Sequence, residues 1–269
     1  MEFYGIIGEK LSHSLSPQIH KKVFELLGIQ GAYKLFEIPK DKVSNLVDSL
    51  KLLKIKGVNV TIPYKETVIN QLDFLSPEAK SIGAVNTILI KDGKANGYNT
   101  DYFGFGSMLD KNNIEVQNKI AIILGSGGAS KAVITYLFDN GVKELYLVTR
   151  NKTSQSELDS RIKLIDYEDL KAVKGDILIN TTPVGMYPKA FDSPVGRDVI
   201  NNFQAIVDII YNPKITEFLR IGQELGKVTC GGLYMLVGQG IKAQEIWQDI
   251  KIDSEITTKI FEELEKEFK

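Results

Sequence analysis

The amino-acid sequence predicts an α/β protein of two domains, the second of which is a Rossmann-type, doubly wound parallel sheet. Its 269 residues exceed the size of one typical domain, which is about 150 residues. Short apolar runs alternate with amphipathic segments along the chain, as strands and helices do in α/β proteins. After residue 100 the apolar runs are almost continuous, at KIAIILG (119–125), ELYLVT (144–149), DILINTT (176–182) and AIVDII (205–210). Such runs are typical of strands that helices cover on both faces.

The first hundred residues predict a smaller α/β domain. The expected strands are 3–8, 32–38, 57–61, 86–90 and 94–98, and the expected helices are 16–27 and 41–53. Ser16 and Pro17 provide an N-cap and a proline at the first position of the first helix. Asp92-Gly93 separates two strand patterns by two residues, which is a strong hairpin signal.

The rest of the chain predicts a last strand, KVTCGG (227–232), followed by helices at about 234–250 and 254–268. The domain boundary is expected near 101–106, where Gly104 and Gly106 are available as hinge positions. We therefore expect one domain at 1–103 and a second at 104–232.

Composition and charge exclude several classes of protein. With 33 Lys+Arg against 34 Asp+Glu, the net charge of −1 argues against non-specific nucleic-acid binding. The single cysteine, Cys230, excludes an intramolecular disulfide and a cysteine-cluster metal site. No apolar stretch approaches the roughly 20 residues that span a bilayer, and the start lacks the apolar core of a signal peptide. We expect a cytoplasmic protein that binds no metal and no membrane.

A glycine-rich loop follows the strand at 119–125 and precedes a helical segment. The loop consists of Gly125, Ser126, Gly127, Gly128, Ala129 and Ser130. Glycines at this junction let the backbone turn tightly and approach a pyrophosphate, whose charge the helix N-terminus stabilises. Ser130 stands where the usual fingerprint has Gly or Ala. The sequence thus predicts a dinucleotide site, and the alternative is a glycine turn without a ligand.

The end of the second strand of this domain favours NADP over NAD. An acidic residue at this place would hold the ribose 2′-hydroxyl of NAD, but the sequence is Thr149-Arg150-Asn151-Lys152. Arg150 can offer a fork of N–H donors to a 2′-phosphate, and Lys152 adds a second positive charge. The alternative is that Arg150 is an ordinary exposed arginine.

Polar residues gather at the ends of the first domain's strands, where open α/β sheets bind ligands. They are Ser14, Ser16, Asn59, Thr61, Lys65, Asn86, Asn99, Thr100 and Asp101. Each has a structural alternative, such as a helix cap for Ser16 or Asp101.

Seven motifs in order along the chain resemble the shikimate dehydrogenase family. They are SHSLSP (12–17), NVTIPYK (59–65), IGAVNT (82–87), GYNTD (97–101), GSGGAS (125–130), NTTPVGM (180–186) and GLYMLVGQ (232–239). The resemblance implies reversible, NADP-dependent reduction of 3-dehydroshikimate to shikimate. It also implies that residues 233–269 return to complete the N-terminal, substrate-binding domain.

The resemblance also implies roles for individual residues. Ser14 and Ser16 would bind the substrate carboxylate, with Tyr211 nearby. Thr61, Lys65, Asn86, Asp101 and Gln239 would bind its hydroxyls, with Lys65 and Asp101 as the catalytic pair. The glycine loop, Thr149, Arg150, Asn151, Ile209, Gly232 and Met235 would contact the cofactor. Ser154 stands where the family often has a further basic residue, and Thr149 replaces a frequent Asn. These two differences reduce the number of contacts expected between this chain and NADP.

The chemistry agrees with these roles. Hydride transfer to a ketone leaves a developing alkoxide that needs a proton donor, and a lysine beside a carboxylate supplies charge and a proton. Neither His13 nor His20 is expected to be catalytic. The alternatives are a quinate or dual quinate/shikimate dehydrogenase, and a non-catalytic NADP- or metabolite-binding protein. The oligomer is expected to be a monomer or a homodimer.

Overall fold

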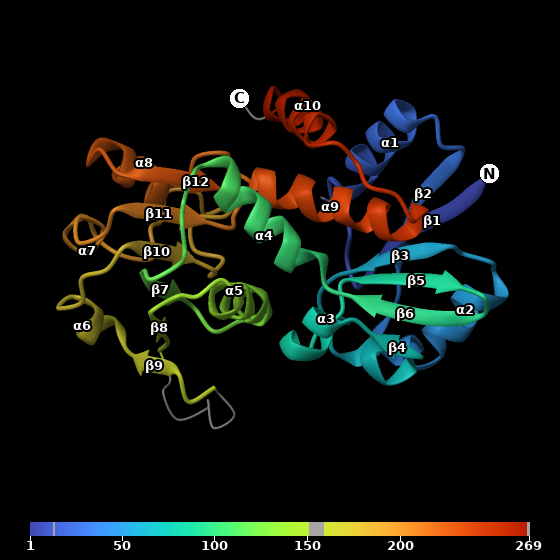
Figure 1. Ribbon diagram of the computed structural model, residues 1–269, viewed down its shortest axis with the longest axis horizontal. Helices are drawn as coiled ribbons and strands as arrows, with labels where there is room; N and C mark the ends of the chain where they lie inside the picture. Colours follow the sequence, from blue (N-terminus) through green and yellow to red (C-terminus); the bar gives the residue numbers. More distant parts are fainter. Residues whose placement is uncertain (13, 151–158, 268–269) are drawn as a thin grey trace. The chain divides into compact units, whose positions relative to one another are not determined.

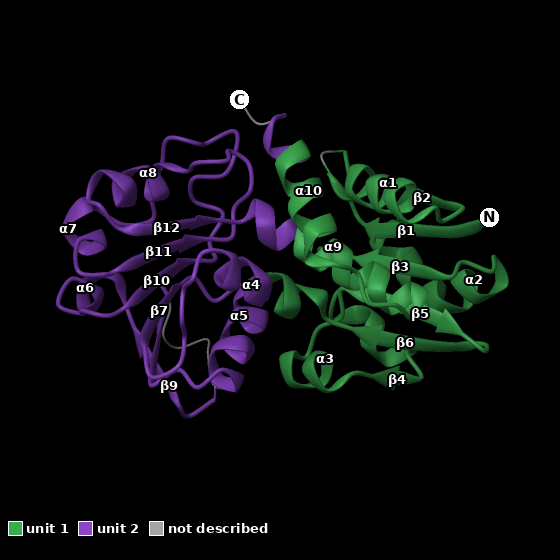
Figure 2. Ribbon diagram, turned by 45° about the horizontal axis from the view of Figure 1, so that its top comes forward, with its two compact units in different colours: residues 1–104, 237–263 green, residues 105–236, 264–269 purple. Residues whose placement is uncertain are grey.

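The structure, a computed structural model, describes residues 1–12, 14–150 and 159–267. The chain folds into two compact units (Figure 2). Unit 1 contains residues 1–104 and 237–263. Unit 2 contains residues 105–236 and the described part of 264–269. The chain thus leaves unit 1 after Gly104 and returns to it within a helix at 237, four residues later than the expected boundary.

Unit 1 is built on a six-stranded sheet with the order β2-β1-β3-β5-β6-β4 (Figure 1). Its strands are β1 (Glu2–Gly8), β2 (Gly31–Glu37), β3 (Gly57–Val60), β4 (Phe74–Leu75), β5 (Thr87–Lys91) and β6 (Lys94–Tyr98). The sheet is mixed rather than wholly parallel, because β5 is antiparallel to both β3 and β6. The β5–β6 hairpin turns at Asp92 and Gly93, which both have positive φ, as the sequence predicted.

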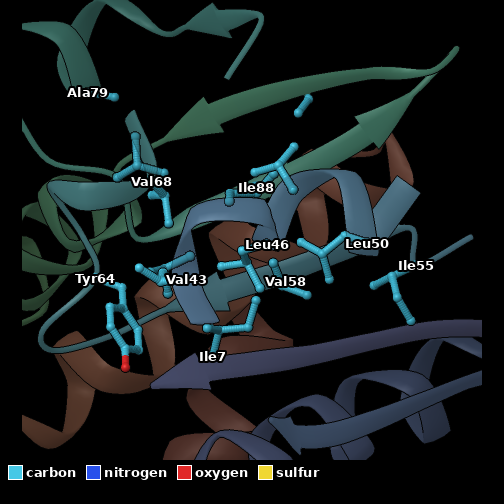
Figure 3. Close-up of a cluster of buried hydrophobic side chains, with 14 residues drawn as sticks. Ile7, Val43, Leu46, Leu50, Ile55, Val58, Tyr64, Val68, Ala79 and Ile88 are labelled. Carbon is cyan, nitrogen blue, oxygen red and sulfur yellow. The ribbon is translucent and has the colours of Figure 1, made fainter. Parts of the chain in front are cut away.

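One face of this sheet packs on short helices. They are η1 (Lys40–Asn45), α2 (Leu46–Leu52), η2 (Thr67–Gln71) and α3 (Pro77–Ile82). Figure 3 shows Ile7, Val58 and Ile88 of the strands facing Leu46 and Leu50 of α2. All of these side chains are buried, and they form the core of this layer.

The opposite face packs on α1 (Ser16–Leu27) and α9 (Leu233–Gln248), which precedes α10 (Ser254–Glu265). Tyr4 of β1, Phe24 of α1, Leu89 of β5 and Trp247 of α9 share one buried cluster. Trp247 also donates a hydrogen bond from Nε1 to the carbonyl oxygen of Ile88, at 3.0 Å. The end of the chain is therefore part of the core of unit 1.

Unit 2 contains a fully parallel sheet with the order β12-β11-β10-β7-β8-β9. Its strands are β7 (Ile120–Leu124), β8 (Glu144–Val148), β9 (Ile162–Ile165), β10 (Ile177–Asn180), β11 (Ala205–Asp208) and β12 (Val228–Gly231). The helices are α4 (Thr100–Lys111), which begins in unit 1, α5 (Gly128–Asp139), α6 (Tyr167–Leu170), α7 (Arg197–Ile200) and α8 (Glu217–Glu224). This strand order is that of the Rossmann fold, so the predicted fold class is confirmed.

Two expectations about helices of unit 1 were wrong in detail. The first helix begins with Ser16, and its N-cap is Leu15, which already has α-helical φ and ψ. The expected helix at 41–53 starts as the 3₁₀ helix η1, because Asn45 (φ −114°, ψ 23°) departs from helical values before α2. Leu53 lies beyond the end of α2 and is exposed.

Among the residues that the structure describes, we find no helix long and apolar enough to cross a membrane.

Candidate active site

Lys65 and Asp101 form an ion pair in unit 1. Lys65 follows β3 and the TIPY turn, and Asp101 lies in the first turn of α4, directly after β6. The Lys65 Nζ atom is 2.5 Å from Asp101 Oδ2, and the two side chains are 25% and 18% exposed. Partial burial strengthens the attraction between these charges and leaves both groups accessible to a small ligand.

Asn86 belongs to a cluster of buried polar side chains in the same unit. Its Oδ1 atom accepts hydrogen bonds from the backbone N–H of Thr100 at 2.7 Å and from the hydroxyl of Thr87 at 3.0 Å. The Thr100 hydroxyl lies 3.0 Å from the same oxygen and 3.4 Å from Gln239 Oε1. Gln239 is therefore part of unit 1, although it is far from Asn86 in sequence.

The serine motif lies at the start of α1. The Ser14 hydroxyl accepts a hydrogen bond from the Ser16 backbone N–H at 3.3 Å, so Ser14, not Ser16, supports the start of the helix. Ser16 is buried and Ser14 is partly exposed. Thr61 directly follows β3, and its N–H donates to the Ile7 carbonyl at 2.8 Å. These residues and the Lys65–Asp101 pair thus belong to one unit.

The glycine loop in unit 2 has the geometry that an anion site requires. Gly125 follows β7 with φ +93°, which favours glycine, and α5 begins directly after Gly127. A Cβ atom at Gly127 or Gly128 would meet no atom within 4 Å, so open space surrounds the loop there. The Ser130 hydroxyl bonds back to the Gly127 carbonyl at 2.6 Å and thereby braces the turn. Ser126 and Ala129 complete the loop.

The loop lies where the strand order reverses, between the ends of β7 and β10. The Thr181 hydroxyl donates to the carbonyl oxygens of Leu124 and Gly125, at 2.9 and 3.0 Å. Thr149 follows β8 and is buried, whereas Arg150 is exposed. Asn151, Lys152 and Ser154 lie outside the described residues. Among the described residues predicted to bind the 2′-phosphate of NADP, Arg150 is the one that lies at the surface.

The remaining predicted cofactor and substrate contacts also belong to unit 2. Ile209 and Tyr211 follow β11, and Met235 lies in the first turn of α9, where it is buried. A Cβ atom at Gly232 would overlap the Ile209 carbonyl and lie 2.9 Å from the Ile210 oxygen. Glycine at position 232 is therefore required by packing of the backbone.

Asp208, at the end of β11, was not predicted. It is fully buried and accepts hydrogen bonds from Asn180 Nδ2, the Ile210 N–H and the Thr216 hydroxyl, at 3.1, 3.0 and 2.7 Å. Burial raises the pKa of this carboxyl to about 6, against the three hydrogen bonds, which lower it. Asp208 joins the end of β10 to the segment after β11, and its sequence signal is a lone acid within an apolar run.

The role of His20 was not predicted from the sequence either. This side chain is buried on α1 and lies in a hydrogen-bonded group with Asn59, Tyr33 and Gln244. Burial lowers the pKa of His20 to about 3, so its ring is neutral at physiological pH. His13 lies outside the described residues. In the described part of the chain, no three His, Cys, Asp or Glu side chains come together as a candidate metal site.

Comparisons with known proteins identify the family. Residues 6–88 match the model of the "Shikimate dehydrogenase substrate binding domain". Over the full length of both chains, the sequence is 58% identical to "Shikimate dehydrogenase (NADP(+))" of Clostridium beijerinckii. Shikimate dehydrogenase 1 of Peptoclostridium difficile is 59% identical, with a TM-score of 0.88 over 100% of this chain and 99% of that one.

A more distant solved structure carries both ligands. It is shikimate 5-dehydrogenase of Thermus thermophilus in complex with NADP(H) and shikimate, which is 31% identical. Its TM-score is 0.88, and the match covers 98% of this chain and 99% of that one. Full-length identity and a shared two-sheet fold lead to one conclusion: the chain belongs to the shikimate dehydrogenase family.

Proposed function

We propose that this protein catalyses the reversible, NADPH-dependent reduction of 3-dehydroshikimate to shikimate, a step in the biosynthesis of aromatic amino acids. The observation that carries the proposal is the Lys65–Asp101 ion pair, 2.5 Å long and partly exposed, in a chain whose full-length relatives are named for this reaction. No observation favours quinate as the substrate.

The proposed proton donor is Lys65. Addition of a hydride to the carbonyl carbon turns the carbonyl oxygen into an alkoxide, and the Lys65 ammonium stabilises that charge and gives it a proton. In the reverse direction the neutral Lys65 amine accepts the hydroxyl proton. Asp101 holds the lysine side chain in place and offers a carboxylate to a neighbouring hydroxyl of the ring.

Asn86, Thr61 and Gln239 are the proposed ligands of the ring hydroxyls. Asn86 Oδ1 already accepts bonds from Thr100 and Thr87, which leaves its Nδ2 group as the donor for a ligand. For the carboxylate we propose Ser14 and Ser16 of unit 1. Hydroxyl donors suit this task because each N–H or O–H bond to a charged acceptor contributes about 1.5–3 kcal/mol.

The glycine loop fits the pyrophosphate of NADP. The first N–H groups of α5 need acceptors, the N-cap Gly127 has no side chain to provide one, and the space around Gly127 and Gly128 is open. When bound, the reduced cofactor, NADPH, would supply the hydride for reduction, and the oxidised form, NADP⁺, would accept it in the reverse reaction. Arg150 is proposed to bind the 2′-phosphate. We thus assign substrate binding to unit 1 and cofactor binding to unit 2.

Replacement of Lys65 tests the proposal. Lys65→Ala should lower kcat for shikimate oxidation by about 10²–10⁴, the usual contribution of a positioned acid–base group, while the melting temperature stays near that of the parent. Lys80→Ala, which removes an exposed lysine from α3, is the matched control and should keep parent kinetics. A Lys65→Ala enzyme with kcat within about twofold of the parent would remove Lys65 from the chemistry. A cytoplasmic location and a monomeric or homodimeric state stay predictions.

A further inference from the structure

A continuous chain of buried polar side chains leads from α9 to Asn86. Gln244 Nε2 lies 2.8 Å from His20 Nδ1, and His20 Nε2 lies 3.0 Å from Asn59 Oδ1. Asn59 Nδ2 donates to the Thr87 hydroxyl at 3.1 Å, and that hydroxyl donates to Asn86 Oδ1 at 3.0 Å. His20, Thr87 and Gln244 are completely buried, and Asn59 and Asn86 nearly so.

The fold brings these residues to one face of the sheet in unit 1. Side chains alternate along a strand, so Asn59 points away from Val58 and Val60, which belong to the cluster under α2. Asn59 and Thr87 are partners in the β3–β5 register and therefore share the face that α1 and α9 cover. Strand alternation and pairing thus place an amide and a hydroxyl directly beneath these two helices.

The chain has a single consistent direction, because its two ends are fixed by groups that only donate. The Gln244 amide N–H can only donate, so His20 Nδ1 accepts and Nε2 carries the proton. The Thr100 backbone N–H can only donate, so the atom of Asn86 that faces it is the oxygen. Between these ends, each group donates to the next one towards Asn86.

His20 is the member that sets this direction at Asn59. Its Nε2–H and the Tyr33 hydroxyl, the latter 2.7 Å away, both donate to Asn59. The Asn59 atom that faces them is therefore the acceptor Oδ1. The Asn59 NH₂ group then faces Thr87, whose hydroxyl proton is left for Asn86 Oδ1 at 3.0 Å or the Thr100 hydroxyl at 3.1 Å. With the other histidine tautomer, Asn59 would turn over, and the Thr87 hydroxyl would donate to Asn59 instead of Asn86. Because burial holds the pKa of His20 far below neutrality, the ring does not become a cation that would donate at both nitrogens.

This arrangement decides which side-chain atom of Asn86, Oδ1 or Nδ2, is available to a ligand. Asn86 Oδ1 is saturated by Thr87 and Thr100, whereas Nδ2 makes no hydrogen bond to the described part of the protein. The amide is thereby held with its two N–H donors available. A ring hydroxyl that also donates to a carboxylate needs such a donor on its oxygen.

We propose that His20 is a positioning residue for the reaction, which supports through Asn59 and Thr87 the orientation that the Thr100 N–H imposes on Asn86, with its N–H groups towards a hydroxyl of the substrate. The inference rests on the proposed function, because it takes Asn86 as a substrate ligand. A purely structural role is the competing explanation, since His20 stacks on Tyr33 at 4.2 Å between ring centroids and lies 5.1 Å from Trp247.

Replacements of His20 that keep or remove the donor separate the two explanations. In His20→Gln the amide can place an N–H donor near the position of Nε2, whereas His20→Leu removes it and keeps an apolar side chain. We expect His20→Leu to raise KM for shikimate about threefold to tenfold, the worth of one neutral hydrogen bond. His20→Gln should return KM to within about twofold of the parent, and KM for NADP should stay constant in both. Val23→Ala, buried on the same helix, is the control for loss of stability alone and should leave both KM values unchanged.

A second pair tests the same chain if the His20 variants do not fold. Thr87→Val keeps the shape of the side chain and removes its hydroxyl, and Thr87→Ser keeps the hydroxyl. Thr87→Val should weaken shikimate binding, measured by calorimetry, about threefold to tenfold more than Thr87→Ser does. Equal shikimate affinity in both Thr87 variants, or a parent-like KM in His20→Leu, would overturn the inference while leaving the proposed function intact. A parent enzyme that does not oxidise shikimate would instead overturn the proposed function.

Discussion

Gly57→Ala should destabilise unit 1, although alanine ordinarily stabilises a strand relative to glycine by about 0.5–1 kcal/mol. Gly57 opens β3 directly beneath Trp247 of α9. A Cβ atom there would overlap Nε1 and Cδ1 of the indole and lie 2.6 Å from its Cε2 atom. Whether Gly57→Ala lowers or raises the stability of the protein therefore tests this packing.

The indole cannot move aside without losing other contacts. Its ring lies 5.1 Å from both Tyr4 and His20, measured between centroids, and its N–H donates to the Ile88 carbonyl. Overpacking costs about 1–3 kcal/mol, and a buried hydrogen bond left unmade costs a further 1–3 kcal/mol. We expect a loss of about 3–5 kcal/mol in the free energy of unfolding, or a fall in Tm of roughly 6–20 °C for a chain of this size.

Thermal unfolding followed by circular dichroism measures this in every variant, because the signal does not depend on Trp247, the one tryptophan of the sequence. The Gly57→Ala substitution should also be made in a Trp247→Leu background, where the indole is absent. There it should cost less than about 1 kcal/mol, since residues in contact are coupled by 0.5–3 kcal/mol and the clash has gone. The same cost in both backgrounds, or a Tm within about 2 °C of the parent, would refute the packing argument.

Three further predictions concern the site. Arg150→Ala should raise KM for NADP about 10–150-fold more than KM for NAD, because a charge-assisted hydrogen bond contributes about 1.5–3 kcal/mol; a parent enzyme with the higher kcat/KM for NAD would contradict the role of Arg150. Gln239→Ala should weaken shikimate binding or turnover at least about tenfold and leave NADP affinity nearly unchanged, as steady-state kinetics with each ligand varied would show. Asp208→Asn should change the pH dependence of stability. The native pKa of Asp208 is raised to about 6, so its protonated form stabilises the folded state below the pKa of the unfolded chain, 3.8, and this stabilisation is lost as the pH rises through 6. Urea unfolding between pH 4 and 7 should therefore show the parent losing about 2 kcal/mol relative to Asp208→Asn, and parallel profiles would argue against a raised pKa.

The features that could be predicted from the sequence are those whose signal is local. The strands of unit 2 are continuous apolar runs because helices cover both of their faces, and the Asp92-Gly93 turn follows from the positive φ angles that its hairpin needs. The glycine loop could be placed for the same reason, since its strand, turn and helix are adjacent. Lys65 and Asp101 were found through a family resemblance, because 36 residues separate them and no periodicity links them.

The features that escaped prediction depend on register or on distant pairs. The mixed sheet of unit 1 follows from how β3 pairs with β5, and two-residue strands such as β4 leave no pattern. His20 looks like any polar residue of an amphipathic helix until Asn59 and Thr87 are paired across two strands. Ser14, rather than Ser16, supports the start of α1 because Leu15 already adopts helical angles, which the residue types do not indicate.

The contribution of α9 to the core of unit 1 has a consequence for synthesis on the ribosome. Residues 1–104 leave the ribosome first, yet Trp247, which packs against Tyr4 and closes over Gly57, follows 143 residues later. At about 5–20 residues per second this delay is on the order of 10 s. During that time the sheet face that carries Tyr4 and Leu89 is covered by α1, which carries Phe24, but it lacks α9. The N-terminal unit of this chain is thus made with all six strands of its sheet, but one face of that sheet stays only partly covered until α9 has been synthesised and docks.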